Sequence, residues 1–374
     1  KKYILYLIKS CNLDGFLILK LLKSSLESAL LGIIKSVGYF EELYAKYKRI
    51  VIVMTEPLFL KPVFHEKIWG GRRLAEDFNY DIPDGTIGEC WAISGHPHGP
   101  NVIENGEFKG QLLPDVYANH PEVFGNPKSK VFPLLTKIID AEASLSVQVH
   151  PDNAYAEEHE HELGKTECWY VIHADEGAYL TYGHTAKTRE ELKEMINNHE
   201  WQKLFDKKPV KTGDFVYVPS GTLHALNKGI VVLETQQSSD TTYRIYDYDR
   251  VDKKTGKKRD LHLKQSIDVT TVPFKEPELH ITSEKIGDSE VTTLITQPDS
   301  PFFSVYKWDV KSKLTRKHEH GPYTLMSVID GEGILTADGK TYPLKKGVHL
   351  LMPATIDEWQ LDGKMLIIAS ESVE

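Results

Sequence analysis

The feature that most constrains this chain is residues 213–227, where a strand-like stretch meets a turn and a histidine follows. Apolar side chains alternate up to Pro219 with the two-residue period of a β-strand. Pro219 cannot continue the hydrogen-bond ladder, and Gly221 tolerates the backbone of a tight turn. We expect His224 to re-enter after that turn and point inward. A single histidine there is more often a core residue than a ligand, so the interpretation depends on its neighbours.

A second strand pattern upstream supplies such neighbours. Between Ser144 and His150, polar and apolar residues alternate strictly, so Ser146, Gln148 and His150 share one face. Burying that polar face is costly unless its groups have partners. Glu167 adds a carboxylate at the point where another apolar run begins.

These patterns together predict one metal centre. Gln148, His150, Glu167 and His224 offer an amide oxygen, two imidazoles and a carboxylate. That set suits a borderline divalent ion such as zinc and leaves room for water or substrate. Because no cysteine is among them, a closed structural zinc site is disfavoured. The alternative is a polar strand cluster satisfied by its own hydrogen bonds.

Length and charge narrow the class of protein. A chain of 374 residues can bury a sizeable core and is long enough for two domains. Its net charge of -9 provides no basic field for nucleic acid, so a small-molecule substrate is favoured. Cys11, Cys90 and Cys168 have no spacing typical of disulfides or a Cys-based zinc site. These features predict a cytoplasmic protein that does not bind membranes.

Residues 1–53 differ in character from the rest. Charged residues interrupt their apolar runs well short of the roughly 20 residues that span a bilayer. They also lack the apolar core and cleavage site of a signal peptide. Because the first methionine is Met54, we expect residues 1–53 to be an extension outside the native enzyme. The alternative is an amphipathic helical arm, since leucines recur there at helical spacing.

From Met54 onward, short strand patterns alternate with Gly, Pro, Asn and Asp turns. Two helices are predicted, at 110–119 and at 188–205, and the second begins with Thr188 and Glu191 at capping-box spacing. Strands with few helices favour a β-sandwich or barrel. The longer helix is expected to pack one stripe into the core: Leu192, Met195, Ile196 and His199.

The chain contains a partial internal repeat of residues 213–227. Residues 347–353 repeat the arrangement of a glycine, five residues and a proline found at 213–219. In this copy Thr355 replaces the bend glycine, and Glu358 stands where His224 would be. We therefore predict a second barrel that has lost metal binding.

A histidine pair in the second copy leaves two interpretations open. His318 and His320 could bind a metal together with Glu358. We favour the simpler interpretation, a solvated loop with two surface histidines.

The paired motifs resemble those of cupins, in which Gly, five residues, Pro-x-Gly-x-x-His follows a first motif bearing His and Glu. A closer resemblance, extending from Glu56 to the C-terminus, is to the short bacterial branch of the type I mannose-6-phosphate isomerases. The stretches that carry it are Lys137 and residues 68–72, 88–91, 146–153, 165–169, 219–224 and 234–244.

This resemblance implies a mainly β fold of two cupin-like jelly-roll barrels with a few short helices, preceded by the helical or disordered extension. Residues 272–277 are predicted to be a linker, or a strand that crosses between domains, which places a catalytic domain at 54–272 and a degenerate cupin-like domain at 273–374. The resemblance also implies an aldose-ketose isomerase that interconverts mannose 6-phosphate and fructose 6-phosphate, with one zinc ion per chain. The family's metal ligands fall on the four residues already chosen: Gln148, His150, Glu167 and His224.

The resemblance also assigns roles around the metal. The family's active-site arginine falls on Arg244, and Asp240 matches an acidic position of the pocket. Longer relatives have His-Lys-Pro-Glu before the metal carboxylate, whereas this chain has Gly-Lys-Thr-Glu at 164–167. A proton-transfer role for that missing histidine cannot be carried over, and Lys165 remains as the matched basic residue.

The reaction explains why such residues are needed. Isomerisation removes a carbon-bound proton, and the resulting enediolate carries charge on oxygen that must be stabilised. Glu234, Asp240 and a zinc-bound water are candidates for the base. Arg244 could hold the oxyanion or, with Lys137, Lys165 and Ser146, the phosphate. The alternative for Arg244 is a surface ion pair, with Asp247 or Asp249 as its partner.

Three other polar stretches receive simpler interpretations. His96 and His98 lie in a Gly/Pro loop, the acidic run at 157–162 is expected to be solvated and mobile, and the basic run at 253–259 is expected to be an exposed turn. The expected partner is a phosphorylated sugar, bound by a monomer or weak homo-oligomer. Two other functions remain open: a non-catalytic cupin-type sugar-phosphate sensor, and a cupin metal-dependent oxygenase.

Overall fold

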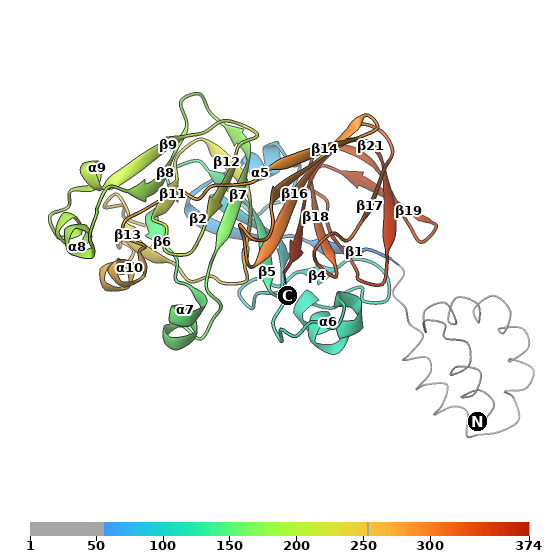
Figure 1. Cartoon of the computed structure of the whole chain (residues 1–374), viewed down its shortest axis with the longest axis horizontal. Coiled ribbons are helices and arrows are strands. Elements are labelled where there is room, and N and C mark those ends of the chain that lie inside the picture. Colours follow the sequence, from blue (N-terminus) through green and yellow to red (C-terminus); the bar gives the residue numbers. More distant parts are fainter. Residues whose placement is uncertain (1–55, 253, 374) are drawn as a thin grey trace, which may run out of the picture. The chain divides into compact units, whose positions relative to one another are not determined.

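The computed structural model describes residues 56–252 and 254–373. The predictions for residues 1–53 and for Met54 lie outside the described residues. Within these ranges no helix has the length and apolar character needed to cross a membrane. Strands form most of the regular structure, and the helices are short (Figure 1).

The first body consists of two antiparallel sheets. Its six-stranded sheet has the order β10 (Phe215–Val218), β7 (Glu167–Ala174), β12 (Ile230–Gln237), β5 (Leu134–Ala141), β3 (Ile87–Ser94), β2 (Val63–Gly71). Its five-stranded sheet has the order β13 (Tyr243–Tyr246), β6 (Val147–Val149), β11 (His224–Leu226), β8 (Tyr179–His184), β9 (Phe205–Pro209).

The central strands of the six-stranded sheet are buried along their whole length, because both faces of the sheet are covered. One face packs on the five-stranded sheet through a core that includes Trp69, Trp169 and Leu226. The other face packs on residues such as Leu74 and Phe78. The predicted ligands lie on or beside strands β6, β7 and β11 of these two sheets.

The second body is built on a ten-stranded antiparallel sheet. Its path is β14 (Thr282–Ile286), β15 (Ser289–Ile295), β16 (Phe303–Val310), β21 (Glu358–Ser372), β18 (Thr324–Ala337), β20 (His349–Met352), β1 (Leu58–Lys61), β4 (Val102–Ile103). Two further strands pair beside it, β17 (Leu314–Lys317) with β21 and β19 (Lys340–Lys345) with β18.

Strand β1 links the two bodies. It precedes the strands of the first body in sequence, yet it pairs with β20, with Leu58 opposite Leu351. The first strand described thus completes the C-terminal sheet.

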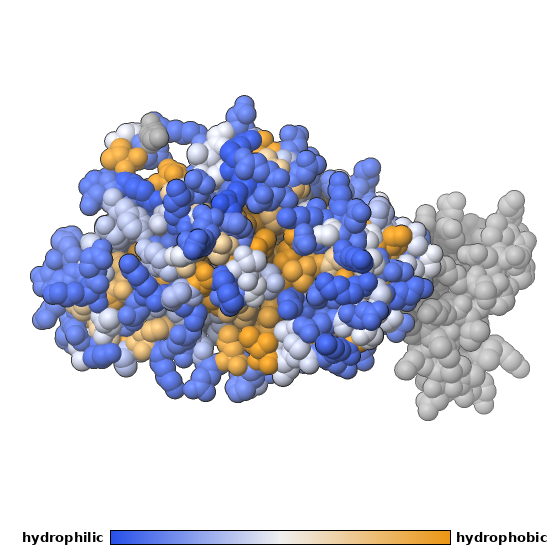
Figure 2. Space-filling view, turned by 90° about the horizontal axis from the view of Figure 1, so that it is seen from above, coloured by the Kyte–Doolittle hydropathy of each residue, from blue (hydrophilic) through white to orange (hydrophobic). Residues whose placement is uncertain are grey.

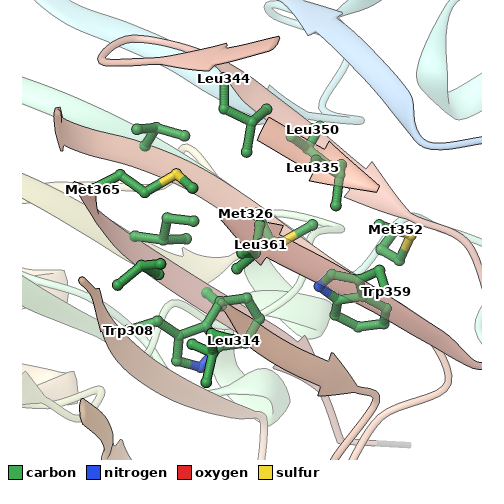
Figure 3. Packing of buried hydrophobic residues seen from close by; sticks show 14 of the residues in the cluster. Trp308, Leu314, Met326, Leu335, Leu344, Leu350, Met352, Trp359, Leu361 and Met365 are labelled. Carbon is green, nitrogen blue, oxygen red and sulfur yellow. The ribbon is translucent and has the colours of Figure 1, made fainter. Parts of the chain in front are cut away.

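A single apolar cluster fills the second body. Figure 3 shows Trp308 and Trp359 among leucine and methionine side chains of this cluster. Both tryptophans are fully buried, and their rings lie 6.4 Å apart between centroids. The interior of the second body is occupied by packed apolar side chains.

The helices are α5 (Arg73–Glu76), α6 (Leu113–Asn119), α7 (Asn153–His159), α8 (Arg189–Asn197), α9 (Trp201–Leu204) and α10 (Leu263–Val269), with a 3₁₀ turn η1 (Pro121–Phe124). The predicted helix at 110–119 is confirmed as α6. The predicted helix at 188–205 is two helices. Thr188 caps the first, accepting from the backbone N–H of Glu191 at 3.1 Å.

The prediction was wrong for His199, which does not lie in the core stripe. Its φ of 55° ends the first helix, and its side chain is exposed. Leu192 and Ile196 are buried as expected.

The face shown in Figure 2 is covered mainly by hydrophilic residues, with hydrophobic ones interspersed. A few large apolar side chains of the described residues are exposed, among them Val251 and Leu261. Such scattered exposure is usual for a globular surface.

Candidate metal centre

The four predicted ligands meet between the two sheets of the first body. Gln148 lies on β6 and His150 directly follows it, while Glu167 begins β7 and His224 begins β11. Across the β6–β11 pair, His224 is the register partner of Gln148. Residues far apart in the sequence are thus brought together by strand pairing.

The turn before His224 has the conformation that its sequence predicts. Gly221 has a φ of +85°, which favours glycine, and its N–H donates to the carbonyl of His150 at 2.9 Å. A Cβ atom at this position would lie 2.4 Å from the hydroxyl of Thr271. The glycine therefore lets β11 start beside the first histidine.

The ligand atoms of His150, Glu167 and His224 all lie within 4.8 Å of one another. Nε2 of His150 is 3.4 Å from Oε2 of Glu167, and Nε2 of His224 is 3.2 Å from Oε1. The side-chain amide nitrogen of Gln148 is 3.4 Å from Nε2 of His224. Among the described residues, His150, Glu167 and His224 form the one group of His, Cys, Asp or Glu side chains found close enough to hold a metal ion.

Both imidazoles are oriented by backbone carbonyls. Nδ1 of His150 lies 2.8 Å from the carbonyl oxygen of Thr241, and Nδ1 of His224 lies 2.9 Å from that of Thr222. Since a carbonyl only accepts, each Nδ1 carries the proton and each Nε2 presents a lone pair to the cluster. This tautomer is the one that metal binding requires.

Charge and burial also fit a cation. Both carboxylate oxygens of Glu167 are buried, and neither has a hydrogen-bond partner among the described residues, although the Lys165 ammonium lies 3.2 Å from Oε2. Burial, followed by the nearby carboxylate of Glu234, raises the pKa of Glu167 to about 7. Burial lowers the pKa of His224 to about 3, so its ring is neutral. The alternative of a cluster satisfied by its own hydrogen bonds does not describe Glu167.

The cluster opens into a cavity of about 280 Å³. Gln148 and His224 line it. All other residues with a predicted catalytic or substrate-binding role also line it: Lys137, Ser146, Lys165, Glu234, Asp240 and Arg244. The structure thus brings the whole predicted set to one place.

Lys137 lies among carboxylates. Its ammonium is 3.4 Å from Oε1 of Glu234, and both side chains are 3 % exposed. Burial alone lowers the pKa of Lys137, but the carboxylates of Glu89 and Glu234 outweigh it and hold the pKa above its ordinary value. Lys137 is therefore charged at neutral pH although its side chain is buried.

Arg244 does not form the surface ion pair considered as its alternative role. Asp247 pairs instead with Arg250 and Arg259, and Asp249 pairs with Lys258. Nε of Arg244 is buried without a hydrogen-bond partner, and no ion pair to its guanidinium is found within the described residues. A cation without an internal partner beside a cavity is suited to an anionic ligand.

Four further charged or titratable side chains line the cavity: Lys67, Glu89, Arg259 and His262. The expectation that 253–259 is wholly an exposed turn was wrong at its last residue, because Arg259 turns inward to Asp247, with Nε 2.8 Å from Oδ2. The one local signal for Glu89 is a charged residue inside the apolar strand β3. Lys67 and His262 have no such signal.

The acidic run at 157–162 is also not solvated throughout. Glu157 and Glu158 are exposed, but Glu162 is partly buried, with Oε1 3.3 Å from Nε2 of the buried His96. The reason is that α7 ends at His159, and the chain then turns back toward the pocket.

The histidine pair of the second body lies in a loop, and His320 is exposed as predicted, whereas His318 differs from the prediction. Nδ1 of His318 contacts the hydroxyl of Thr324 at 2.8 Å, and its ring is partly buried. Glu371 accepts from the backbone N–H groups of Glu319, His320 and Gly321. This carboxylate fixes the loop.

Comparison with known proteins matches two family models to this chain. The catalytic domain of type I phosphomannose isomerase matches residues 58–184, and the cupin domain of mannose-6-phosphate isomerase matches residues 293–372. The chain belongs to the type I phosphomannose isomerase family. It is an isomerase, and the predicted family and mainly β cupin fold are confirmed.

The chain matches relatives in this family over almost the whole length of those relatives. The chain is 56% identical to mannose-6-phosphate isomerase of Streptococcus mutans over 323 residues, which are 86% of this chain and 100% of that protein. It is 51% identical to mannose-6-phosphate isomerase ManA of Bacillus subtilis over 84% of this chain and 99% of that protein. A crystal structure of mannose 6-phosphate isomerase from Bacillus subtilis has a TM-score of 0.81 at 46% identity, covering 84% of this chain and 99% of that chain.

Proposed function

We propose that this isomerase interconverts mannose 6-phosphate and fructose 6-phosphate with a bound zinc ion, by proton transfer through an enediol. The observation that carries the proposal is a buried carboxylate and two imidazoles aimed at one point, at the base of a cavity lined by lysines and arginines. The similar proteins of Streptococcus mutans and Bacillus subtilis are mannose-6-phosphate isomerases, which supports mannose 6-phosphate as a substrate.

The residues proposed to hold the zinc ion are His150, Glu167 and His224. Gln148 is proposed as the fourth ligand through its amide oxygen, which requires the amide group to turn over, because its nitrogen is the atom that faces His224. When bound, the ion supplies Lewis-acid polarisation of the sugar's carbonyl and hydroxyl oxygens. The neutral imidazoles and the buried carboxylate, whose oxygens have no hydrogen-bond partner among the described residues, favour a divalent cation with nitrogen and oxygen ligands.

We assign the removal of the carbon-bound proton to Asp240 as the general base. Glu234 is committed to the protein, since Oε2 accepts from the indole of Trp169 at 2.8 Å and Oε1 faces Lys137. Asp240 lies at the cavity wall, and its Oδ2 is 3.1 Å from Nδ1 of His98, whose side chain is 63% exposed. Asp240 can therefore exchange a proton with solvent between turnovers.

The cations of the cavity are proposed to have two roles: some stabilise the enediolate oxygens, and one binds the phosphate. Lys137 and Lys165 lie near the ligand cluster and are assigned to the oxygens that gain charge as the enediolate forms. Arg244, with its free guanidinium, is assigned to the phosphate, and Ser146 offers a hydroxyl to the sugar.

The decisive experiment is a coupled assay for fructose 6-phosphate formed from mannose 6-phosphate, with and without a chelator, on the wild-type chain and on His224→Ala. Chelation and the substitution are each expected to abolish turnover, and zinc is expected to restore the chelated wild type only. Turnover that survives both treatments would remove the metal from the mechanism. Binding without turnover would favour a sensor, and oxygen consumption would favour an oxygenase.

The remaining predictions concern the setting of the enzyme. We propose action in the cytoplasm on a phosphorylated sugar, as a monomer or weak homo-oligomer. The proposed cytoplasmic location is supported by Cys90 and Cys168, which are free and buried rather than joined in disulfides. We also propose the division into a catalytic domain at 54–272 and a degenerate cupin-like domain at 273–374.

A further inference from the structure

Glu162 lies outside the cavity lining but is connected to the metal cluster through one short loop. We infer that Glu162 is a positioning residue for the ligand His150, acting through the loop 239–241. The inference rests on the proposed metal site, because its effect is on how firmly His150 is held toward a cation.

One carboxylate oxygen of Glu162 collects three donors from that loop. Oε2 lies 3.1 Å from the hydroxyl of Ser239, 3.3 Å from the backbone nitrogen of Asp240 and 3.0 Å from the hydroxyl of Thr241. The other oxygen, Oε1, faces Nε2 of His96 at 3.3 Å. A single side chain thus contacts every residue of the loop.

The loop carries the contact that orients His150. Its last residue, Thr241, presents the carbonyl oxygen that lies 2.8 Å from Nδ1 of His150. A histidine ligand is held to its metal-binding tautomer by the partner of its second nitrogen, and loss of such a partner typically costs about 10- to 100-fold in metal affinity or activity. In this chain the partner is a main-chain carbonyl, so its position depends on whatever holds the loop.

Further contacts also hold the loop. Nδ1 of His98 lies 3.1 Å from Oδ2 of Asp240, and the backbone N–H of Thr241 donates to the hydroxyl of Ser239 at 3.3 Å. The side-chain amide of Gln236 donates to the carbonyl of Ser239 at 2.7 Å. The end of the loop is tied by the hydroxyl of Thr241, which donates to Glu162. Among these contacts, the one with Glu162 is the only tie from Thr241 to a residue outside the loop other than His150. Removing the carboxylate is therefore expected to loosen the orienting carbonyl.

The charge state of Glu162 suits this role. Burial alone would raise the pKa of Glu162, but the donors from Thr241, Ser239 and Asp240 outweigh it and leave the pKa below its ordinary value. The carboxylate therefore accepts from all three donors at neutral pH. It also holds Asp240, whose side chain lines the cavity.

The test compares Glu162→Ala, Glu162→Gln and the control Glu158→Ala. Glu158 lies in the same acidic run and is exposed, with no hydrogen bond or ion pair found for it within 56–252 and 254–373. The measurements are the rate at which zinc passes to a chromophoric chelator, kcat and KM separately, and the thermal midpoint of the metal-free protein.

Glu162→Ala is expected to release zinc at least about 10-fold faster and to lower kcat with little change in KM. Glu162→Gln keeps one oxygen acceptor and is expected to stay within a few-fold of wild type, while Glu158→Ala should match wild type. Thr241→Val, which removes one donor but keeps the carbonyl, is expected to accelerate release in the same direction. That variant provides the test if Glu162→Ala does not fold.

The inference is overturned if Glu162→Ala, or Thr241→Val in its place, releases zinc at the wild-type rate, or if only its thermal midpoint changes. It is also overturned if Glu162→Gln releases zinc as fast as Glu162→Ala. Failure of the proposed function is a separate result, since the wild-type chain would then retain no zinc at all.

Discussion

The side-chain amide of Gln148 lies 3.4 Å from Nε2 of His224, across a strand pair that joins residues 76 positions apart in the sequence. The register of β6 against β11 therefore decides whether a metal centre exists. A slip of one residue would turn His224 to the opposite face of its sheet. Binding a cation should in turn stabilise this pairing.

Zinc is expected to raise the thermal midpoint of the metal-free protein. A ligand at 100 times its Kd adds about 2.7 kcal/mol to the free energy of unfolding, which corresponds to a shift of several degrees. His224→Ala should lose this shift because it removes a ligand. Differential scanning with and without added zinc measures it, and an equal shift in both proteins would place the ion elsewhere.

Lys137→Met is expected to destabilise the fold as well as stop the reaction. It removes the ammonium that faces Glu234 and leaves buried carboxylates without this partner. Breaking a buried pair from one side costs about 3 kcal/mol or more in the free energy of unfolding. Denaturant unfolding measures this loss, and Lys193→Met at an exposed position is the control. A stable but inactive variant would contradict the electrostatic part of the prediction.

Arg244→Lys should show the opposite combination. The guanidinium has no ion pair to other described side chains, so stability is expected to stay near that of wild type. A lysine lacks the planar fork that binds a phosphate through two bonds, so kcat/KM is expected to fall at least about 10-fold. Steady-state kinetics alongside a melting curve separate the two effects. An active Arg244→Lys enzyme would assign the phosphate to other cations.

The sequence predicted those parts of the site that local patterns encode. The alternation up to His150 and the turn at Gly221 can each be recognised within its own short stretch of sequence, because a strand period and a glycine turn are local properties. The inward turn of Arg259 has no such signal, since it depends on pairing with Asp247. The partner of β1 was equally hidden, because β20 lies almost 300 residues away on an otherwise ordinary apolar pattern.

The burial of His349 predicts how the free energy of unfolding falls in acid. Nε2 of His349 lies 2.6 Å from the hydroxyl of Tyr80, and Nδ1 lies 2.9 Å from the hydroxyl of Ser327. Burial lowers the pKa of His349 to about 3, from an ordinary value of 6.5. Since the unfolded state binds the proton more tightly, the stability from this residue is full above pH 6.5 and is lost as pH falls toward 3.

Between pH 7 and pH 5 this single group should cost about 2 kcal/mol in the free energy of unfolding. His349→Gln cannot take up the proton, so its stability should change less over that interval. Urea unfolding of both proteins at the two pH values measures the difference. Parallel losses in the two proteins would show that other groups dominate the acid transition.

Asp240→Asn tests which carboxylate moves the proton. The amide keeps the size of the side chain and its place at the cavity wall but cannot accept a proton from carbon, so kcat should fall by about 10²- to 10⁴-fold. Incorporation of solvent deuterium at the sugar's C2 should fall in parallel, because the exchange passes through the same group. His98→Asn, which alters only the exposed neighbour at 3.1 Å, should retain most of the turnover. If Asp240→Asn still exchanges deuterium at the wild-type rate, another group removes the proton. The remaining candidates are then a zinc-bound water and Glu234, whose contact with Trp169 would serve to orient a base.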